Sequence, residues 1–134
     1  MKKTALLTAI GLAGGLAQAH SLDFAADKYT AKTAEVNGAT IAYRAYEGIP
    51  YVSKPVEPEY QQINIYIPEA YYNGGSINGY TATTAPIFLP NQIGGYMPAK
   101  PGVPGEGKHG AQKGADAMQT ALAKGYIVAS PGAR

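Results

Sequence analysis

Two adjacent glycines follow a short apolar run in the stretch PIFLPNQIGGYMP, which spans Pro86 to Pro98. Glycine has no Cβ, so the backbone at Gly94 and Gly95 can come closer to a bound group than that of any other residue. One interpretation is that their amides stabilise a negatively charged oxygen, which needs donors about 3 Å away. The other is a tight turn without a ligand, and the two glycines taken alone favour this second interpretation.

Side chains for nucleophilic catalysis are sparse. The sequence has no G-x-S-x-G elbow, and its serines stand at positions 21, 53, 76 and 130. Ser130 precedes Pro-Gly at the end of an apolar run, without the strand-turn-helix that exposes a catalytic serine, so we interpret it as a strand-end residue. His20 lies at the expected cleavage point of an export signal, and His109 lies in a Pro/Gly-rich loop. We therefore assign no catalytic residue within this chain.

Two patterns imitate known sites and are set aside. Gly102 to Lys108 matches most of a P-loop, but His109 stands where Ser or Thr would bind magnesium, and Pro104 removes an amide. Glu57 and Glu59 point the same way on an extended segment, but no third ligand is near in the sequence. Solvated edge charges explain them better. We expect no metal site.

The elements that would position the two glycines begin with antiparallel strands. Residues 28–36 and 39–46 read as strands on either side of Asn37-Gly38, the strongest short signal for a two-residue hairpin. Residues 60–67 form a further strand, and Pro68 ends it.

A strand–loop–helix–strand unit follows. The continuous apolar run at 86–90 predicts a short strand buried on both sides, and YIVAS at 126–130 predicts another. Between them, residues 113–124 predict a helix that ends before Gly125. Its expected apolar stripe is Ala117, Met118, Ala121 and Leu122.

This order of elements predicts a mixed α/β sheet. The strand–helix–strand unit should form a parallel pair with a right-handed crossover, added to the antiparallel strands. One helix and two parallel strands cannot cover both faces of such a sheet. We therefore expect the sequence to be an incomplete piece of a larger domain.

Residues 1–19 have the features of a secretory signal peptide. Lys2 and Lys3 form the positive region, Thr4 to Leu16 the apolar region, and Ala17-Gln18-Ala19 the cleavage site. The protein is therefore expected to be exported to the periplasm or the medium. The apolar run is too short for a stable membrane span, so no membrane insertion is expected after cleavage.

Charge and composition narrow the expected partners. The chain has 11 Lys+Arg and 9 Asp+Glu, and two lysines leave with the signal, which gives 9 − 9 = 0 for residues 20–134. A neutral chain without a basic cluster argues against a nucleic-acid partner. The chain has no cysteine, so an exported domain would fold without disulfides.

Three segments together resemble a known family. YRAYEGIPYVSKPVEPEYQQINIYIPEAYY, APIFLPNQIGGYMP and ALAKGYIVASPGAR look like the N-terminal part of the bacterial tannase-type α/β-hydrolases, which are secreted or cell-associated serine esterases. The resemblance covers about residues 35–134. It implies that residues 20–134 are the N-terminal part of an α/β-hydrolase domain, truncated before the nucleophile elbow.

The resemblance also implies a role for the glycines. In α/β-hydrolases the loop after the third strand supplies one backbone N–H of the oxyanion hole, and lipase-like members read His-Gly-Gly-Gly there. The equivalent stretch here is Gln92 to Tyr96, with Gly94 and Gly95 as the candidate donors and Tyr96 as a wall of the substrate pocket. The histidine of the lipase-like motif is missing, which leaves open which of the two amides points inward.

The implied activity is hydrolysis of a small phenolic ester, such as a galloyl ester, by a Ser-His-Asp mechanism. No cofactor is needed, and the triad would lie beyond Arg134. An alternative from another class is a complete, small β-rich module of the cell envelope that binds polysaccharide without catalysis. Eleven tyrosines would suit its surface. Cooperative unfolding of residues 20–134 alone would support the module, whereas exposed apolar edges would support the partial hydrolase.

Overall fold

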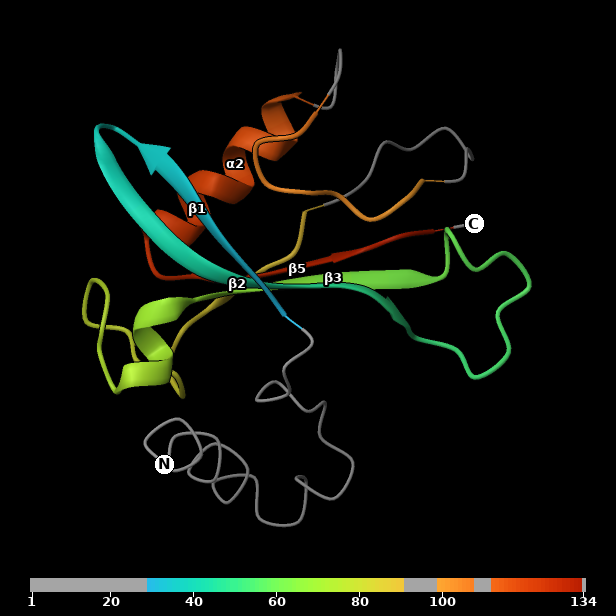
Figure 1. Cartoon of the computed structure of the whole chain (residues 1–134), viewed down its shortest axis with the longest axis horizontal. Helices are drawn as coiled ribbons and strands as arrows, with labels where there is room; N and C mark the ends of the chain where they lie inside the picture. Colours follow the sequence, from blue (N-terminus) through green and yellow to red (C-terminus); the bar gives the residue numbers. More distant parts are fainter. Residues whose placement is uncertain (1–28, 91–98, 108–111, 134) are drawn as a thin grey trace.

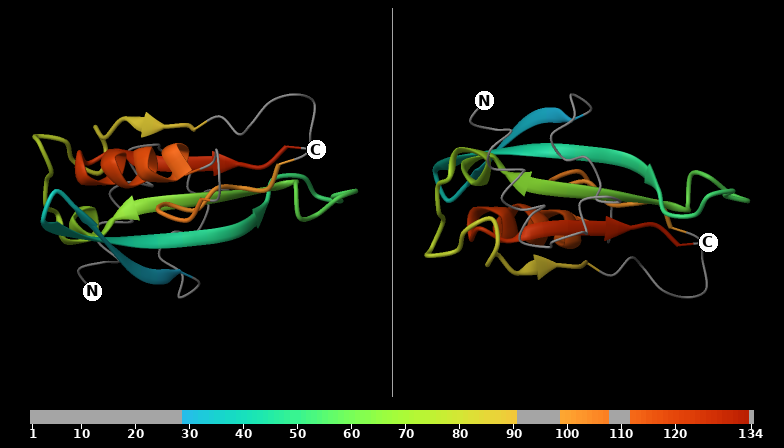
Figure 2. Two further views of the ribbon diagram at one scale, coloured as in Figure 1. Left: turned by 90° about the horizontal axis from the view of Figure 1, so that it is seen from above. Right: turned by 90° about the horizontal axis from the view of Figure 1, so that it is seen from below.

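The computed structural model describes residues 29–90, 99–107 and 112–133. Within these ranges five strands form one sheet in the order β1-β2-β3-β5-β4 (Figures 1 and 2). The elements are β1 (Thr30–Val36), β2 (Ala39–Pro50), β3 (Gln62–Pro68), the 3-10 helix η2 (Glu69–Asn73), β4 (Ile87–Phe88), α2 (Gln112–Ala123) and β5 (Ile127–Pro131).

The antiparallel half of the sheet confirms the hairpin prediction. β1 and β2 pair with Val36 opposite Ala39, so only Asn37 and Gly38 form the turn. Both have positive φ, 53° and 83°, as a type I′ turn requires. β2 runs further than the sequence indicated, and its pairing with β3 continues to Pro50 across a register shift between Tyr46 and Ile49.

The parallel pair is also confirmed. Ile87 and Phe88 of β4 pair in parallel with Ile127 and Val128 of β5. β5 pairs antiparallel with β3 on its other side, so it lies between two strands that precede it in the sequence. The sheet is therefore mixed, with one helix between its two parallel strands.

The expected burial of the run at 86–90 is wrong. Ile87 is 66% exposed and Leu89 is 59% exposed, while Phe88 packs partly against the core. The reason is the position of β4, which is the edge of the described sheet and has β5 as its neighbour there. Figure 2 shows β4, in yellow, at one side of the sheet and β1, in blue, at the other.

α2 lies across one face of the sheet (Figure 1). Its buried residues are Ala115, Met118, Ala121 and Leu122, so Ala115 takes the place that the sequence analysis gave to Ala117, which is exposed. The spacing 115–118–122 keeps a narrow stripe toward the sheet, and Ala117 falls outside it. The buried core comprises Ala34, Tyr43, Ala45, Tyr66, Ala115, Met118, Ala121, Leu122 and Val128.

α2 ends at Ala123, and Gly125 stops it as the sequence indicated. Gly125 has φ +91°, its amide donates to the Leu122 carbonyl at 3.0 Å, and the next amide, of Tyr126, donates to the Ala121 carbonyl at 2.9 Å. These two bonds are the Schellman pattern, which pairs helix carbonyls that would otherwise lack donors. The chain thereby turns directly into β5.

The two faces of the sheet differ in cover. On β3, Asn64 and Tyr66 are buried beneath the α2 layer, whereas Ile63, Ile65 and Ile67 alternate to the opposite face and are half-buried. A face rich in isoleucine and only half-buried agrees with the expectation that one helix leaves one side of the sheet partly bare.

No helix within the described ranges has the length and apolar character of a membrane span.

Candidate functional site

The stretch that contains the predicted glycine loop is attached at both of its ends to the carboxyl edge of the parallel pair. The chain leaves β4 through Leu89 and Pro90. The next described residue, Ala99, forms an antiparallel bridge with Ala133, just beyond the end of β5, through N–O distances of 2.7 and 2.8 Å. Both ends of the intervening stretch are therefore fixed at the same edge of the sheet.

The predicted site residues Gly94, Gly95 and Tyr96 belong to this intervening stretch and lie outside the described residues. His20 and His109 lie outside them as well. The structure thus places the two points of attachment of the glycine loop. The assignment of its amides as oxyanion donors remains a prediction.

Three chain segments meet at Gly132, next to this edge. The Gly132 amide donates to the Gln62 carbonyl at 2.8 Å, and its carbonyl accepts from the Tyr51 hydroxyl at 2.9 Å. A Cβ at position 132 would lie 2.5 Å from the Tyr60 carbonyl oxygen and 2.9 Å from that of Ala99. These are backbone atoms that cannot move aside, so this packing admits only glycine.

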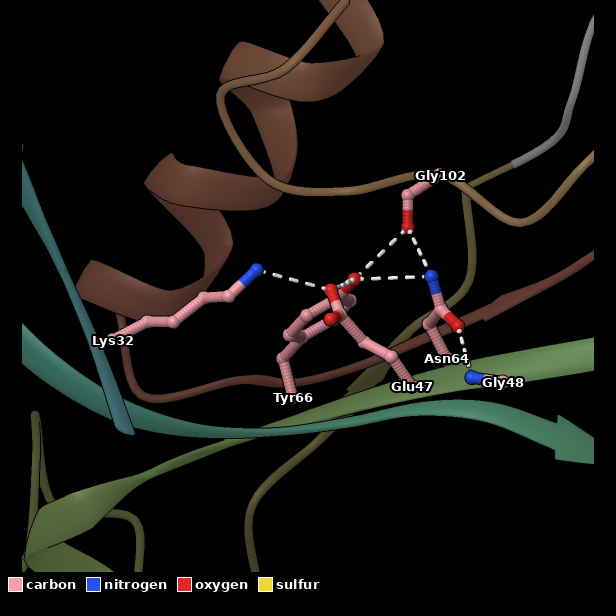
Figure 3. A network of polar contacts seen from close by, with 6 residues as sticks. All are labelled: Lys32, Glu47, Gly48, Asn64, Tyr66 and Gly102. Carbon is pink, nitrogen blue, oxygen red and sulfur yellow. Dashed lines mark hydrogen bonds and ion pairs between the residues drawn. The ribbon is translucent and has the colours of Figure 1, made fainter. Parts of the chain in front are cut away.

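The backbone of Gly102 is held on both sides by buried side chains, and Figure 3 shows the two on its carbonyl side, Asn64 and Tyr66. Its amide donates to Ser130 Oγ at 2.8 Å. Its carbonyl accepts from Asn64 Nδ2 at 3.1 Å and lies 3.2 Å from the Tyr66 hydroxyl. We call Ser130, Asn64 and Tyr66, with the Gly102 peptide that they hold, the Gly102 clamp.

Ser130 is fully buried, and its hydroxyl serves the clamp. Its interpretation as a strand-end residue is thus extended: it anchors a neighbouring segment. Asn64 uses both ends of its amide, because Oδ1 also accepts from the Gly48 amide at 2.9 Å while Nδ2 donates. Sequence reasoning missed Asn64, although an asparagine at the centre of the apolar strand YQQINIYI is a signal that could have drawn attention to it.

A chain of polar contacts continues from the clamp to the surface (Figure 3). Tyr66 donates to Glu47 Oε2 at 2.8 Å, and Lys32 Nζ lies 3.1 Å from the same oxygen. Burial, reinforced by the hydrogen bond to the Glu47 carboxylate, raises the pKa of Tyr66 well above its ordinary value. Tyr66 therefore stays a neutral donor at physiological pH.

A second cluster lies on the face of the sheet away from α2. The Arg44 guanidinium stacks between the rings of Tyr29 and Tyr72, 4.2 and 3.8 Å from their centroids. It also donates two hydrogen bonds to Glu69, at 2.8 and 3.0 Å. These contacts join η2 to β2, and the hydrogen bonds to Glu69 raise the pKa of Arg44, which keeps it charged.

The tyrosines are mostly structural within the described part of the chain. Tyr46 and Tyr72 share a hydrogen bond between hydroxyls at 2.7 Å, and Tyr71 donates to the Gly125 carbonyl at 2.5 Å. Tyr43 and Tyr66 pack edge to face beneath α2. The buried tyrosines are Tyr43, Tyr46, Tyr66, Tyr71 and Tyr72. Five of the eleven tyrosines in the sequence are therefore buried in the interior and cannot form the wall of a binding site.

The patterns set aside in the sequence have structural roles in the described residues. Val103 and Glu106 close a tight turn, and the Gly105 amide donates to the Ala115 carbonyl at 3.0 Å. Glu59 forms an exposed ion pair with Lys100 at 3.0 Å. Across the described ranges, no three acidic or histidine side chains gather as metal ligands would.

Comparison with known proteins points to one enzyme family. No protein-family model and no curated protein match the chain. Among solved structures, a tannase from Fusobacterium nucleatum is 50% identical over 81% of this chain and 22% of its own, with a TM-score of 0.72. The likeness to bacterial tannases is confirmed.

Two further structures agree with this tannase likeness. A tannin acyl hydrolase in complex with 3,4-dihydroxybenzoate is 36% identical over 79% of this chain and 23% of its own, with a TM-score of 0.70. A tannase from Lactobacillus plantarum is 36% identical over 79% of this chain and 22% of its own, also with a TM-score of 0.70. The tannase-like chain spans between a fifth and a quarter of the length of the solved structures that it matches.

Proposed function

We propose that this chain is the N-terminal part of an exported carboxylic ester hydrolase of the tannase type, with an α/β-hydrolase fold. The observation that carries the proposal is the 50% identity to the Fusobacterium tannase, together with the shared fold. The chemistry of the tannases is therefore the chemistry that we propose for the intact protein. The polysaccharide-binding module is not favoured, because the matching structures are tannases.

The proposed substrate is a phenolic ester. One matching tannin acyl hydrolase structure holds 3,4-dihydroxybenzoate and another holds ethyl gallate, both of which carry a hydroxylated benzoyl group. In the proposed reaction a serine, deprotonated by a histidine that an aspartate orients, attacks the ester carbonyl. An acyl-enzyme forms, the alcohol leaves, and water then releases the phenolic acid. We propose that these three side chains lie in polypeptide beyond residue 134.

The contribution proposed for this chain is stabilisation of the oxyanion. Gly94 and Gly95 would present backbone amides to the negative oxygen of the tetrahedral intermediate, and Tyr96 would line the substrate pocket. The support is the place of the loop, since its two ends attach at the carboxyl ends of β4 and β5. Active sites of open α/β sheets form at that edge of the strands. Export by the signal at residues 1–19 is part of the same proposal.

A chimera tests the proposal directly. Residues 29–134 of this chain would replace the matching segment of the Fusobacterium tannase, and hydrolysis of ethyl gallate would be measured. We expect activity in the chimera and none on p-nitrophenyl esters from the isolated 134-residue chain. A folded chimera without activity would contradict the proposal, and so would turnover by the isolated chain.

Substitutions of the two glycines resolve which amide acts. In the chimera, Gly94→Val and Gly95→Val each place a branched Cβ beside a candidate donor. We expect at least one of them to lower kcat by about a hundredfold, the loss typical of one oxyanion donor. Gly114→Ala is the matched control, because nothing lies within 4 Å of a Cβ at that helix position. If both valine variants retain full kcat, the oxyanion assignment is wrong.

A further inference from the structure

The Gly102 clamp places two polar side chains where apolar ones would be expected. Asn64 of β3 and Ser130 of β5 are directly paired across the sheet, and both face the α2 layer. Asn64 is 6% exposed and Ser130 is fully buried. Their neighbours on that face, Tyr66 and Val128, belong to the core. A buried polar pair in such a place costs stability unless its hydrogen bonds are made.

The clamp makes those hydrogen bonds to the backbone N–H and C=O of one residue, Gly102, in an irregular segment. Ser130 accepts from the Gly102 amide and Asn64 donates to the Gly102 carbonyl, at 2.8 and 3.1 Å. A valine or isoleucine pair would pack at these strand positions but could not fix the peptide. The polar pair therefore specifies the path of the segment as well as filling the interior.

Residues 99–107 are in fact fixed at three successive points. Ala99 is bridged to Ala133 at the end of β5, the Gly102 peptide is held by the clamp, and the Gly105 amide donates to Ala115 of α2. The clamp is the middle point, and it joins the segment to β3 and to β5, the strand at which the sheet changes from antiparallel to parallel pairing. Loss of the clamp would leave the short bridge at Ala99 as the main constraint on the chain that enters this edge.

We propose that Ser130 and Asn64 are positioning residues for ester hydrolysis. The inference rests on the proposed function. The clamp would hold the chain that follows the predicted glycine loop, from Ala99 onward, in a fixed position at the carboxyl edge of β4 and β5. Neither side chain touches the substrate. Each acts through the Gly102 peptide, and misplacing catalytic donors by about 1 Å can cost a hundredfold in rate.

The test compares two substitutions that remove the same chemical group at opposite ends of β5. In the chimera, Ser130→Ala removes a buried hydroxyl bonded to the backbone of Gly102. Tyr71→Phe removes a buried hydroxyl bonded to the backbone of Gly125. Ser130 and Tyr71 are 0% and 2% exposed, so both variants leave one backbone group without its buried partner. Asn64→Asp, which loses the donor to the Gly102 carbonyl, is the second clamp variant.

We expect Ser130→Ala and Asn64→Asp to lower kcat on ethyl gallate by about ten- to a hundredfold, with KM within about twofold. Amide exchange at Gly102 should become faster in both. Tyr71→Phe should lower the midpoint of thermal unfolding and leave kcat within about twofold, because it perturbs the other end of the strand.

The outcomes separate this inference from the proposed function. If the unsubstituted chimera is folded but inactive, the proposed function is wrong and the positioning role falls with it. If the chimera is active and the clamp variants keep full kcat, the clamp is purely structural. The same conclusion follows if the clamp variants lose no more kcat than Tyr71→Phe does at an equal loss of stability. A rise in KM with unchanged kcat would also overturn the positioning role.

Discussion

At the scale of the residue, the buried polar side chains have hydrogen-bonding partners. In the described part of the chain, no buried side-chain nitrogen or oxygen lacks a hydrogen bond. Arg44 illustrates the point, since its guanidinium is 4% exposed yet has two aromatic faces and a carboxylate around it. Lysine could not replace it, because an ammonium has neither the planar fork nor the stacking faces.

The buried tyrosines predict a loss of stability at high pH. Burial raises the pKa of Tyr66 and of Tyr72 in the folded chain, whereas both have a pKa near 10 when unfolded. The folded state thus binds these protons more tightly. Their contribution is complete below about pH 10 and decreases as pH rises above it, by about 1.4 kcal/mol per pH unit for each group.

Urea unfolding of the chimera, with and without the two substitutions, between pH 8 and pH 11 measures this effect. We expect the free energy of unfolding to fall above pH 10, and to fall less steeply in the double variant Tyr66→Phe, Tyr72→Phe. The two phenylalanines also remove hydrogen bonds, so the slope with pH is the informative quantity rather than the absolute stability. An equal slope in the double variant and the unsubstituted chain would disprove the assignment.

At the scale of the element, the junction between α2 and β5 depends on one glycine. Gly125 combines φ +91° with close neighbours, since an added Cβ would lie 2.7 Å from the Tyr71 hydroxyl and 3.0 Å from the Ile77 carbonyl oxygen. The left-handed conformation ends the helix, and the close packing seats η2 and the following loop against the start of β5. Both requirements exclude a side chain.

Two glycine-to-alanine changes therefore have opposite expected effects. Gly125→Ala should lower the free energy of unfolding by about 2 kcal/mol or more, from backbone strain and the contacts with Tyr71 and Ile77. Gly114→Ala should raise it by about 0.5–1 kcal/mol, because alanine favours the helix and position 114 is open. Urea titration of both variants in the chimera measures the difference. Equal effects at the two positions would contradict this account of the junction.

The elements could largely be predicted from the sequence, and the exceptions share a cause. Asn37, Gly38 and Gly125 favour positive φ by their residue type alone, so the hairpin and the helix end can be predicted from the local sequence. The exposure of Ile87 and Leu89 does not follow, because it depends on which strands lie beside β4. Ala115 rather than Ala117 faces the core because the rotation of α2 is set by contacts with the sheet.

The candidate site could be predicted only in part for a related reason. The glycines at 94 and 95 stand out as a local pattern, although they lie outside the described residues. The Gly102 clamp joins residues from β3, β5 and the segment before α2, and no local pattern links Asn64 to Ser130. Such a constellation becomes visible only when the strand register is known.

At the scale of the whole molecule, β4 is an edge strand of the described sheet and has exposed apolar side chains beside it. Ile87 and Leu89 account for two of the four large apolar side chains that are exposed in the described ranges, the others being Tyr51 and Val56. An exposed apolar edge strand promotes association with other chains. In a protein of tannase length, we expect further polypeptide to cover this edge.

The isolated chain should therefore bind a hydrophobic dye and self-associate. Leu89→Lys is expected to reduce both, because a charge on the edge discourages strand pairing and shrinks the apolar patch. Val56→Lys is the matched control, since Val56 is 70% exposed but lies in the loop between β2 and β3. Dye fluorescence and light scattering measure the outcome. Equal reductions by the two lysines would show that β4 is not the adhesive edge.

The place of β5 has a consequence for how the molecule assembles during synthesis. β3 and β4 emerge from the ribosome well before β5, yet β5 must come between them. Until it arrives, β3 is paired only with β2 and β4 lacks its neighbour in the sheet, and closing the gap requires contacts between residues distant along the chain, which are slow to form. During this time the nascent polypeptide exposes unpaired strand edges, which are prone to aggregate and which a chaperone could bind.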